Sequence, residues 1–339
     1  MWKKLALGVA LGVVACSLLG GCGSGGASKV NVPKEKLTLG KLEASYYMLE
    51  NKTGAEFYTS CYGVVGDRIY AYNEDKSALQ VYAIKGAEFT MKNDNLIPNF
   101  RKLTAVSSNG KFVLLANNRG AYTSKIGEDK FTQVVKKYGN YTTAPGTNHV
   151  ISLTDPKEGR IGEFAEDGRI INMKPLPGTV RTEKKEQQAY MPNARDFAMD
   201  KDNYYCQVTK RIVYADNNRG DNINHFFAFG HEKSEPTFVI GPKLSTDVRN
   251  DLNYLSDGFT AVTDKYIVVI FSGASSDTLY IYNKRDGSLV AKKEKLGQLL
   301  GKEMGAVYAA EGDSFYIAGF ERDKDSRKRL KSSLFKVEL

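Results

Sequence analysis

Cysteine and histidine are scarce in this sequence: its 339 residues include four cysteines and three histidines. Beyond residue 22 the chain has no Cys-x-x-Cys pair, no His-Glu-x-x-His motif, no Gly-x-Ser-x-Gly elbow and no complete P-loop. Such motifs supply metal ligands, an activated nucleophile or a cradle for phosphate. Their absence excludes the common zinc, serine-hydrolase and P-loop nucleotide-binding classes that sequence motifs can reveal.

The N-terminal segment lacks charge: after Lys3 and Lys4, no charged residue occurs before Cys22. A short basic segment, an apolar stretch and small residues at its end are the parts of a secretory signal peptide. Residues 19–22 read Leu-Gly-Gly-Cys, which resembles the lipobox of bacterial lipoproteins. The resemblance implies cleavage before Cys22, a diacylglycerol on the Cys22 thiol and, often, acylation of the new amino group. Two or three acyl chains anchor firmly, because each buried methylene contributes about 0.8 kcal/mol and one chain alone is marginal.

Two other interpretations of this segment stay open. Residues 5–22 could form a short uncleaved membrane helix, which needs roughly 17–25 residues, although their many glycines make a poor helix. Cys16, after Val-Val-Ala, is a rival lipidation site inside the apolar stretch. Residues 23–28 (GSGGAS) are typical of a flexible tether. The sequence therefore predicts a signal peptide over 1–21, a lipidated cysteine and tether over 22–34, and a folded domain over 35–339.

A lipid anchor predicts a location in the bacterial cell envelope, with the domain on the exported side of a membrane. Gly23 stands where enteric lipoproteins retained at the inner membrane carry aspartate, so the resemblance favours the outer membrane in a Gram-negative cell. The formal net charge of +9 is mild and is spread along the chain. It suits an anionic envelope surface and does not indicate nucleic acid. The expected partners are the lipid bilayer, through Cys22, and an envelope protein or glycan.

Internal repetition organises the remaining chain. A short apolar segment, a turn with Gly, Asp or Asn, and an alternating strand recur six times. The copies are VVGDRIYAY from Val64, VSSNGKFVLL from Val106, APGTNHVISL from Ala144, AMDKDNYYCQV from Ala198, VTDKYIVVIF from Val262 and AAEGDSFYIAG from Ala309. Each reads as the end of one strand, a tight turn and a second strand. With three or four antiparallel strands per copy, the pattern predicts an all-β fold, a six-bladed β-propeller.

The ends of the domain suggest how the ring closes. The last copy shows three clear strands, so we expect a strand over 36–40 (KLTLG) to supply the fourth and cover an exposed edge. Short helices are predicted over 242–257 and 293–304. A pair of β-sandwiches or an irregular barrel is the rival fold, but neither explains six similar units.

By pattern, the domain resembles the six-bladed propeller lipoproteins of the TolB-like and NHL-like group. It lacks the Trp-Asp endings of WD40 blades, and its one tryptophan, Trp2, is too few for a quinoprotein-type propeller. Export would permit a disulfide between Cys61 and Cys206. Because the two cysteines fall in repeats that a propeller keeps apart, separate thiols are the favoured interpretation.

Two kinds of metal site can be considered. Oxygen-rich turns resemble fragments of calcium loops that lack the following acidic ligand; these are Asp200, Asp202 and Asn203 in one turn and Asp216, Asn218 and Asp221 in another. A zinc-like site could recruit His225 and His231 with Asp216, Asp221 or Glu232, because imidazole and carboxylate suit such ions. The alternative is structural, since Asp and Asn are common in tight turns and His225 stands in an alternating aromatic strand. No cofactor is predicted, and calcium is the cation that these turns could accept.

A four-residue segment, Asn-Asn-Arg-Gly, occurs at 117–120 and again at 217–220. If both copies are blade turns on one face, Arg119 and Arg219 could hold an anionic ligand. Shared turn chemistry is the alternative, since Asn and Gly accept positive φ.

Tether, repeat domain and missing catalytic motifs together favour a non-catalytic binding or scaffold lipoprotein. The competing hypothesis is a propeller-type enzyme, a lactonase or glycan-cleaving protein, with a metal or carboxylate site at the central channel. Side chains from different blades would form such a site, so spacing along the sequence does not reveal it. The residues that line the channel separate the two hypotheses.

Overall fold

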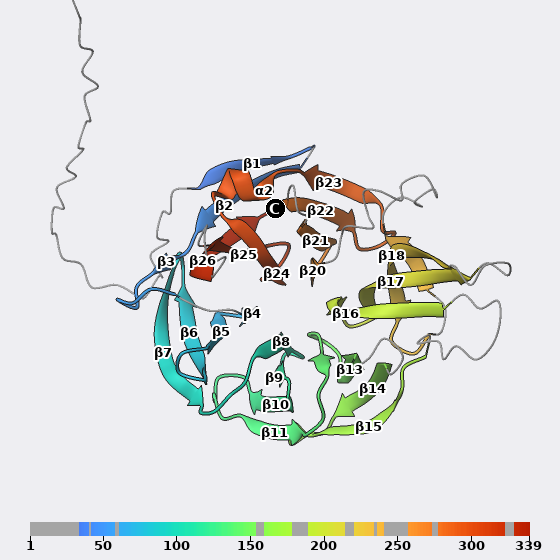
Figure 1. Ribbon diagram of the computed structural model, residues 1–339, viewed down its shortest axis with the longest axis horizontal. Helices are drawn as coiled ribbons and strands as arrows, with labels where there is room; N and C mark the ends of the chain where they lie inside the picture. The colour runs from blue at the N-terminus through green and yellow to red at the C-terminus, as the bar shows by residue number, and fades with distance from the viewer. Residues whose placement is uncertain are drawn as a thin grey trace, which may run out of the picture. The chain divides into compact units, whose positions relative to one another are not determined.

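Six antiparallel sheets surround a common axis in the computed structural model (Figure 1). The structure describes residues 34–40, 42–57, 61–153, 159–177, 189–213, 220–233, 236–240, 257–272, 277–322 and 329–339. All of these residues belong to one structural unit, residues 32–339. The six sheets are the blades of a β-propeller, and the predicted fold class is confirmed.

The blades follow one another along the chain, each running from an inner to an outer strand. Blade 1 is β4 (Cys61–Val65), β5 (Arg68–Asn73), β6 (Ala78–Lys85) and β7 (Glu88–Ile97), with β3 (Glu50–Asn51) parallel to β7. Blade 2 is β8 (Leu103–Ser108), β9 (Phe112–Asn117), β10 (Gly120–Lys125) and β11 (Thr132–Val135). Blade 3 is β12 (Asn140–Thr142), β13 (His149–Leu153), β14 (Gly159–Phe164) and β15 (Ile170–Pro175).

The second half of the ring has the same organisation. Blade 4 is β16 (Ala189–Met199), β17 (Asn203–Val213), β18 (Gly220–Gly230) and β19 (Pro236–Ile240). Blade 5 is β20 (Asp257–Val262), β21 (Tyr266–Ser272), β22 (Asp277–Asn283) and β23 (Leu289–Lys293). Blade 6 is β24 (Glu303–Ala309), β25 (Phe315–Arg322) and β26 (Arg329–Glu338), joined by β2 (Leu42–Met48) and β1 (Glu35–Leu39). A short helix, α2 (Leu296–Leu300), lies within the predicted range 293–304; most of the other predicted helix, 242–257, lies outside the described residues.

Every one of the six repeated turns joins the first strand of a blade to the second, as the repeat predicts. Four of these turns contain a glycine at positive φ: Gly66, Gly110, Gly146 and Gly312. In the fourth blade the turn is held by a side chain, since Asp200 Oδ1 accepts hydrogen bonds from the backbone N–H groups of Asp202 and Asn203, both at 2.8 Å. Glycine and aspartate thus stabilise the same tight turn in different copies.

The core lies between blades, because each sheet packs both of its faces against its neighbours. Strand β9 shows this most simply, since all six of its residues are buried. Its adjacent residues Leu114 and Leu115 point to opposite faces of the sheet. Leu114 packs with the blade 3 residues Val150 and Phe164, while Leu115 packs with the blade 1 residue Tyr70.

The N-terminal strands close the ring, but the expected pairing was wrong in one respect. Strand β2, not residues 36–40, is the fourth strand of blade 6 and pairs with β26, while β1 is the fifth and outermost strand. In Figure 1 the blue N-terminal strands lie beside the red C-terminal ones. The physical reason is connectivity: the chain leaves β2 toward blade 1, and β1 folds back on β2 through a turn at Gly40, whose φ is 63°.

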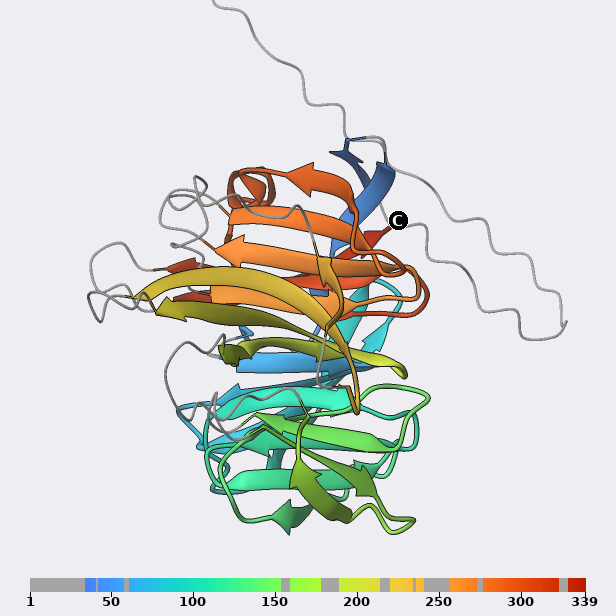
Figure 2. The ribbon, with the colours of Figure 1, turned by 90° about the vertical axis from the view of Figure 1, so that its right-hand side faces the viewer.

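The strands run between the two faces of the ring (Figure 2). Because each blade alternates direction, first-to-second and third-to-fourth strand turns lie on one face, here called the turn face. Second-to-third strand turns lie on the other, the opposite face. Cys61 belongs to β4 in blade 1 and Cys206 to β17 in blade 4, a separation that agrees with two unbonded thiols.

Candidate functional site

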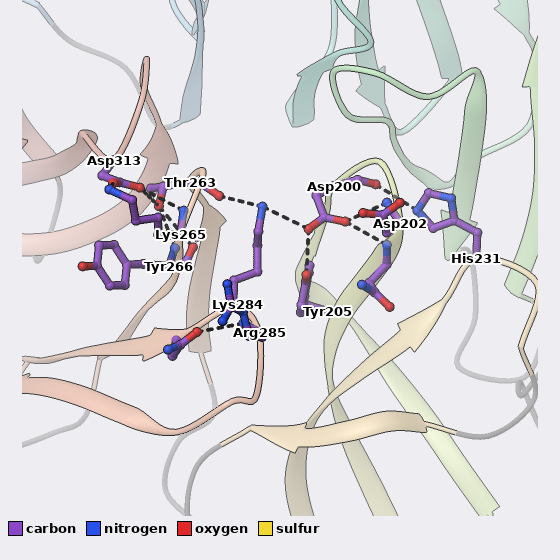
Figure 3. A network of polar contacts seen from close by, with 12 residues as sticks. Asp200, Asp202, Tyr205, His231, Thr263, Lys265, Tyr266, Lys284, Arg285 and Asp313 are labelled. Atoms are coloured by element: carbon purple, nitrogen blue, oxygen red, sulfur yellow. Dashed lines mark hydrogen bonds and ion pairs between the residues drawn. The ribbon is translucent and has the colours of Figure 1, made fainter.

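Polar side chains on the turn face form a continuous series of contacts from blade 6 to blade 3. Figure 3 shows most of this series, which we call the inter-blade network; its members are Asp313, Thr263, Lys265, Lys284, Asp200, Tyr205, His231 and His149. Most stand in or next to the repeated turns, so the network follows from the way a propeller places the turns of neighbouring blades side by side.

Asp313 links blade 6 to blade 5. Its Oδ1 accepts the backbone N–H of Lys265 at 2.9 Å, and its Oδ2 lies 2.7 Å from Lys265 Nζ. The Thr263 hydroxyl also lies 3.4 Å from Asp313 Oδ1. Burial acts to raise the pKa of Asp313, but the hydrogen bonds and charge of Lys265 outweigh it, so the pKa is lowered. Asp313 therefore binds its neighbour as a carboxylate.

Lys284 links blade 5 to blade 4. It stands in the turn between β22 and β23, and its Nζ donates to the carbonyl oxygen of Thr263 at 3.1 Å. The same Nζ lies 3.4 Å from Asp200 Oδ2, and the two side chains are 27% and 15% exposed. An ion pair so shielded from solvent is screened less by salt than a surface pair.

Asp200 is the most heavily engaged carboxylate of the network. Besides the two backbone N–H groups of its own turn, it accepts the Tyr205 hydroxyl on Oδ2 at 2.7 Å. Burial acts to raise the pKa of Asp200. The hydrogen bonds from the Asn203 N–H, the Tyr205 hydroxyl and the Asp202 N–H, with the charge of Lys284, outweigh burial, so the pKa is lowered. The pKa of Tyr205 is raised, first by burial and then by the Asp200 charge. The phenol stays protonated and donates.

Two histidines link blade 4 to blade 3. His149 begins β13, and His231 follows β18 and is 6% exposed. Their Nδ1 atoms are 2.9 Å apart and their rings meet edge to face. His231 Nε2 lies 2.9 Å from the carbonyl oxygen of Asp200. Burial, and then the proximity of His149, lower the pKa of His231, so its ring is neutral at neutral pH.

Equivalent links recur farther round the ring. Arg68 in blade 1 pairs with Asp129, between the third and fourth strands of blade 2. Thr123 in blade 2 donates to the carbonyl oxygen of Gly168 at 3.0 Å, in the same connection of blade 3. Side-chain contacts on the turn face thus link neighbouring blades from blade 1 through blade 6.

The sequence candidates have different places in the structure. Asp200 and His231 belong to the network, whereas Asp202 is exposed and contributes its backbone N–H. Arg119 is exposed in the turn between β9 and β10, on the opposite face. Asp221 and His225 stand in β18, but their side chains are outside the described residues. Cys22, Asp216, Asn218 and Arg219 are outside them entirely.

Sequence reasoning missed the partner of His231. It grouped His231 with its neighbours along the chain, but Glu232 pairs with Lys174 at 2.7 Å, and His149 is the residue that His231 meets. The repeat gave only half of the signal: His149 follows the turn of the third copy, but His231 follows the third strand of its blade, outside the repeated segment. Thr263, Lys265 and Asp313 lie in the turns of the fifth and sixth copies. Calcium binding by the aspartate-rich turns stays a prediction.

The inner strands bear on the enzyme hypothesis. The sequences of β4, β8 and β12 contain no charged residue, and β24 has one, Glu303, at its start. Within the described ranges, no group of three or more His, Cys, Asp or Glu side chains is placed to hold a metal ion. Apart from Glu303, the charged residues of the inner strands fall in β16 and β20, as Arg195, Asp196 and Asp257, so these four strands do not support the enzyme hypothesis.

Comparison with known proteins supports the fold and does not establish a function. No protein-family model matches the chain. No curated protein matches it either. Among solved structures, the WD40 repeats of RRP9 align with a TM-score of 0.51 at 10% identity, over 90% of this chain and 100% of that one. U3-55K aligns with a TM-score of 0.50 at 10% identity, over 87% and 98%. At this identity the likeness establishes the β-propeller fold alone. Among the described residues, none of the helices is long and apolar enough to cross a membrane.

Proposed function

We propose that the chain is a bacterial lipoprotein that acylated Cys22 anchors to a membrane of the cell envelope, with the propeller acting as a non-catalytic binding or scaffold module. The partner is an envelope protein or a glycan. In this proposal the mature chain begins at Cys22, residues 22–34 tether it, and the ring over 35–339 is held near the membrane surface on the exported side.

The sequence supports the anchor through the basic pair, the uncharged apolar stretch and the Leu-Gly-Gly-Cys ending. The inter-blade network is the structural observation that supports a binding role. The titratable groups of the network are occupied by one another: Asp313 by Lys265, Asp200 by Tyr205 and Lys284, and His231 by His149. A general acid or base needs a group that faces substrate, and these groups face neighbouring blades.

The opposite face is the one that we assign to the partner. Arg119 is exposed there, and among the described residues its guanidinium forms no ion pair. Its turn is firmly built, since Asn117 Oδ1 accepts the Arg119 N–H at 2.8 Å and Gln133 donates to the Arg119 carbonyl oxygen at 3.1 Å. A guanidinium that forms no ion pair with the described residues, on a hydrogen-bonded turn, suits an acidic protein surface or an anionic glycan.

Labelling cells with a radioactive fatty acid tests the anchor. The wild-type protein and a Cys16→Ala control should take up label, because the proposed acylation is at Cys22. The Cys22→Ala protein should take up none and should leave the membrane fraction. Label on Cys22→Ala would place the anchor elsewhere, and loss of label in Cys16→Ala would favour the rival site.

Binding to isolated envelope components tests the module. The full-length chain in detergent is mixed with peptidoglycan sacculi or solubilised envelope proteins, and the bound fraction is measured. Arg119→Gln should weaken binding, whereas Lys111→Gln, which removes the same charge from an exposed site on the turn face, should not. Equal loss in both variants would refute the assignment of the face, and turnover of a small molecule without any binding partner would refute the non-catalytic role.

A further inference from the structure

The contact between His149 and His231 has the parts of a metal site. Two imidazoles from different blades, separated by 82 positions in the chain, meet through their Nδ1 atoms. The sequence contains one other histidine, His225. Imidazole nitrogen is a preferred ligand of zinc, copper and nickel ions, so a convergent pair of such nitrogens is chemically suited to one of them.

The far side of the His231 ring is fixed. Its Nε2 faces the backbone carbonyl oxygen of Asp200 at 2.9 Å, and because a carbonyl oxygen accepts, Nε2 must carry the proton. In the neutral ring, the lone pair then resides on Nδ1, directed at His149. A metal-binding histidine characteristically donates its other ring N–H to a carbonyl or carboxylate, which fixes both tautomer and orientation. His231 has that arrangement.

The separation of the nitrogens suits two neighbouring ligands of one ion. Bonds from nitrogen to such metals are about 2.0–2.1 Å, so two ligands at 90° to each other stand about 2.9 Å apart, and two at the tetrahedral angle about 3.3–3.4 Å. The two Nδ1 atoms lie 2.9 Å apart, at hydrogen-bond distance. This separation matches neighbouring positions of a tetragonal or octahedral ion, the geometry of Cu²⁺ and Ni²⁺, after a small rotation of each ring to aim its lone pair at the ion.

The surroundings leave the pair accessible from solvent. Glu232 follows His231 directly in the chain. Lys174 pairs with Glu232 at 2.7 Å, and both side chains are more than half exposed. Water therefore reaches this ion pair. His231 is buried while His149 is partly exposed, which leaves a side from which an ion and its waters can approach.

We propose that His149 Nδ1 and His231 Nδ1 together bind one Cu²⁺ or Ni²⁺ ion between blades 3 and 4, with water in the remaining coordination positions. Without metal, His149 donates its Nδ1 proton to His231. On binding, that proton is exchanged for one on His149 Nε2, so both rings stay neutral and coordinate through their lone pairs. The ion would bridge two blades and replace one hydrogen bond by two metal bonds.

The test is a titration of the full-length chain in detergent with Ni²⁺ by calorimetry and with Cu²⁺ by electron paramagnetic resonance. The expected result is one ion per chain, with the hyperfine pattern of two nitrogen ligands. His149→Gln and His231→Gln should each lower affinity by more than about tenfold, since even residues behind the ligands have effects of that size. His225→Gln is the matched control and should bind like wild type.

Circular dichroism establishes that each variant is folded, and His149→Gln is decisive because His149 is the more exposed of the two. Binding unchanged in His149→Gln would overturn the proposal and leave the pair as a hydrogen bond alone. Loss of binding in His225→Gln with retention in His149→Gln would overturn it in favour of a site built around β18.

Discussion

Replacing Asp200 by alanine should destabilise the ring far more than its place in an exposed turn suggests. The Asp200 carboxylate accepts hydrogen bonds from two backbone N–H groups and the Tyr205 hydroxyl, and it forms an ion pair with Lys284. Alanine removes all four interactions. It leaves the hydroxyl of Tyr205, whose side chain is fully buried, without its acceptor.

The size of the effect follows from these contacts. A hydrogen bond to a charged group contributes about 1.5–3 kcal/mol, and leaving a buried donor unsatisfied costs about 1–3 kcal/mol. Because the Asp200 side chain keeps 15% exposure, water compensates part of the loss, and we expect about 3 kcal/mol. Asp202→Ala, in the same turn but exposed, should change stability by less than about 0.5 kcal/mol.

Urea unfolding followed by circular dichroism measures both variants. A double-mutant cycle with Tyr205→Phe isolates the hydroxyl–carboxylate bond, for which we expect a coupling free energy of about 1–3 kcal/mol. If Asp200→Ala were no more destabilising than Asp202→Ala, or the coupling were near zero, the network would not hold the blades and the reasoning would fail.

Three further predictions concern other parts of the ring. Leu115→Ala should cost about 2–5 kcal/mol, measured by urea unfolding, because it opens a cavity between blades 1 and 2. The pKa of Asp313 is lowered from 3.8 in the folded chain. Its contribution to the free energy of unfolding is therefore complete above pH 3.8 and is lost as pH falls through the folded pKa. Asp313→Asn should therefore flatten the acid limb of the stability curve below about pH 4. Gly120→Ala should cost more than about 2 kcal/mol in thermal or urea unfolding, since φ is 138° and a Cβ would lie 1.9 Å from the Val135 carbonyl oxygen.

The repeat was enough to predict the blades because local signals dominate there. Each copy carries a turn residue that the backbone requires, such as Gly110 or Asp200, followed by alternating apolar residues. The order of the closing strands was harder to predict. Residues 36–40 look like a strand as readily as 42–48 do, and only the path from β2 toward blade 1 decides which of them pairs with β26.

The inter-blade network could not be predicted by reading along the chain. Asp313 and Lys265 are 48 positions apart, and His149 and His231 are 82 apart. Motif searches look for ligands at short, fixed spacing, which is why His231 was grouped with His225. A propeller instead places the first-to-second strand turn of one blade beside the third-to-fourth strand turn of the next, as the His149–His231 and Asp200–Lys284 contacts show. Comparing both kinds of turn in successive blades is the search that would have found the pair.

Site-specific photo-crosslinking in living cells tests the central claim, that an anchored ring binds a partner through its opposite face. A photoreactive amino acid is placed at Asn118, beside Arg119, and in a second strain at Lys201 on the turn face; both positions are exposed. We predict a discrete crosslinked product from position 118 that disappears in the Cys22→Ala background, and none from position 201. A product from position 201 alone, or one from 118 that persists without the anchor, would contradict the account.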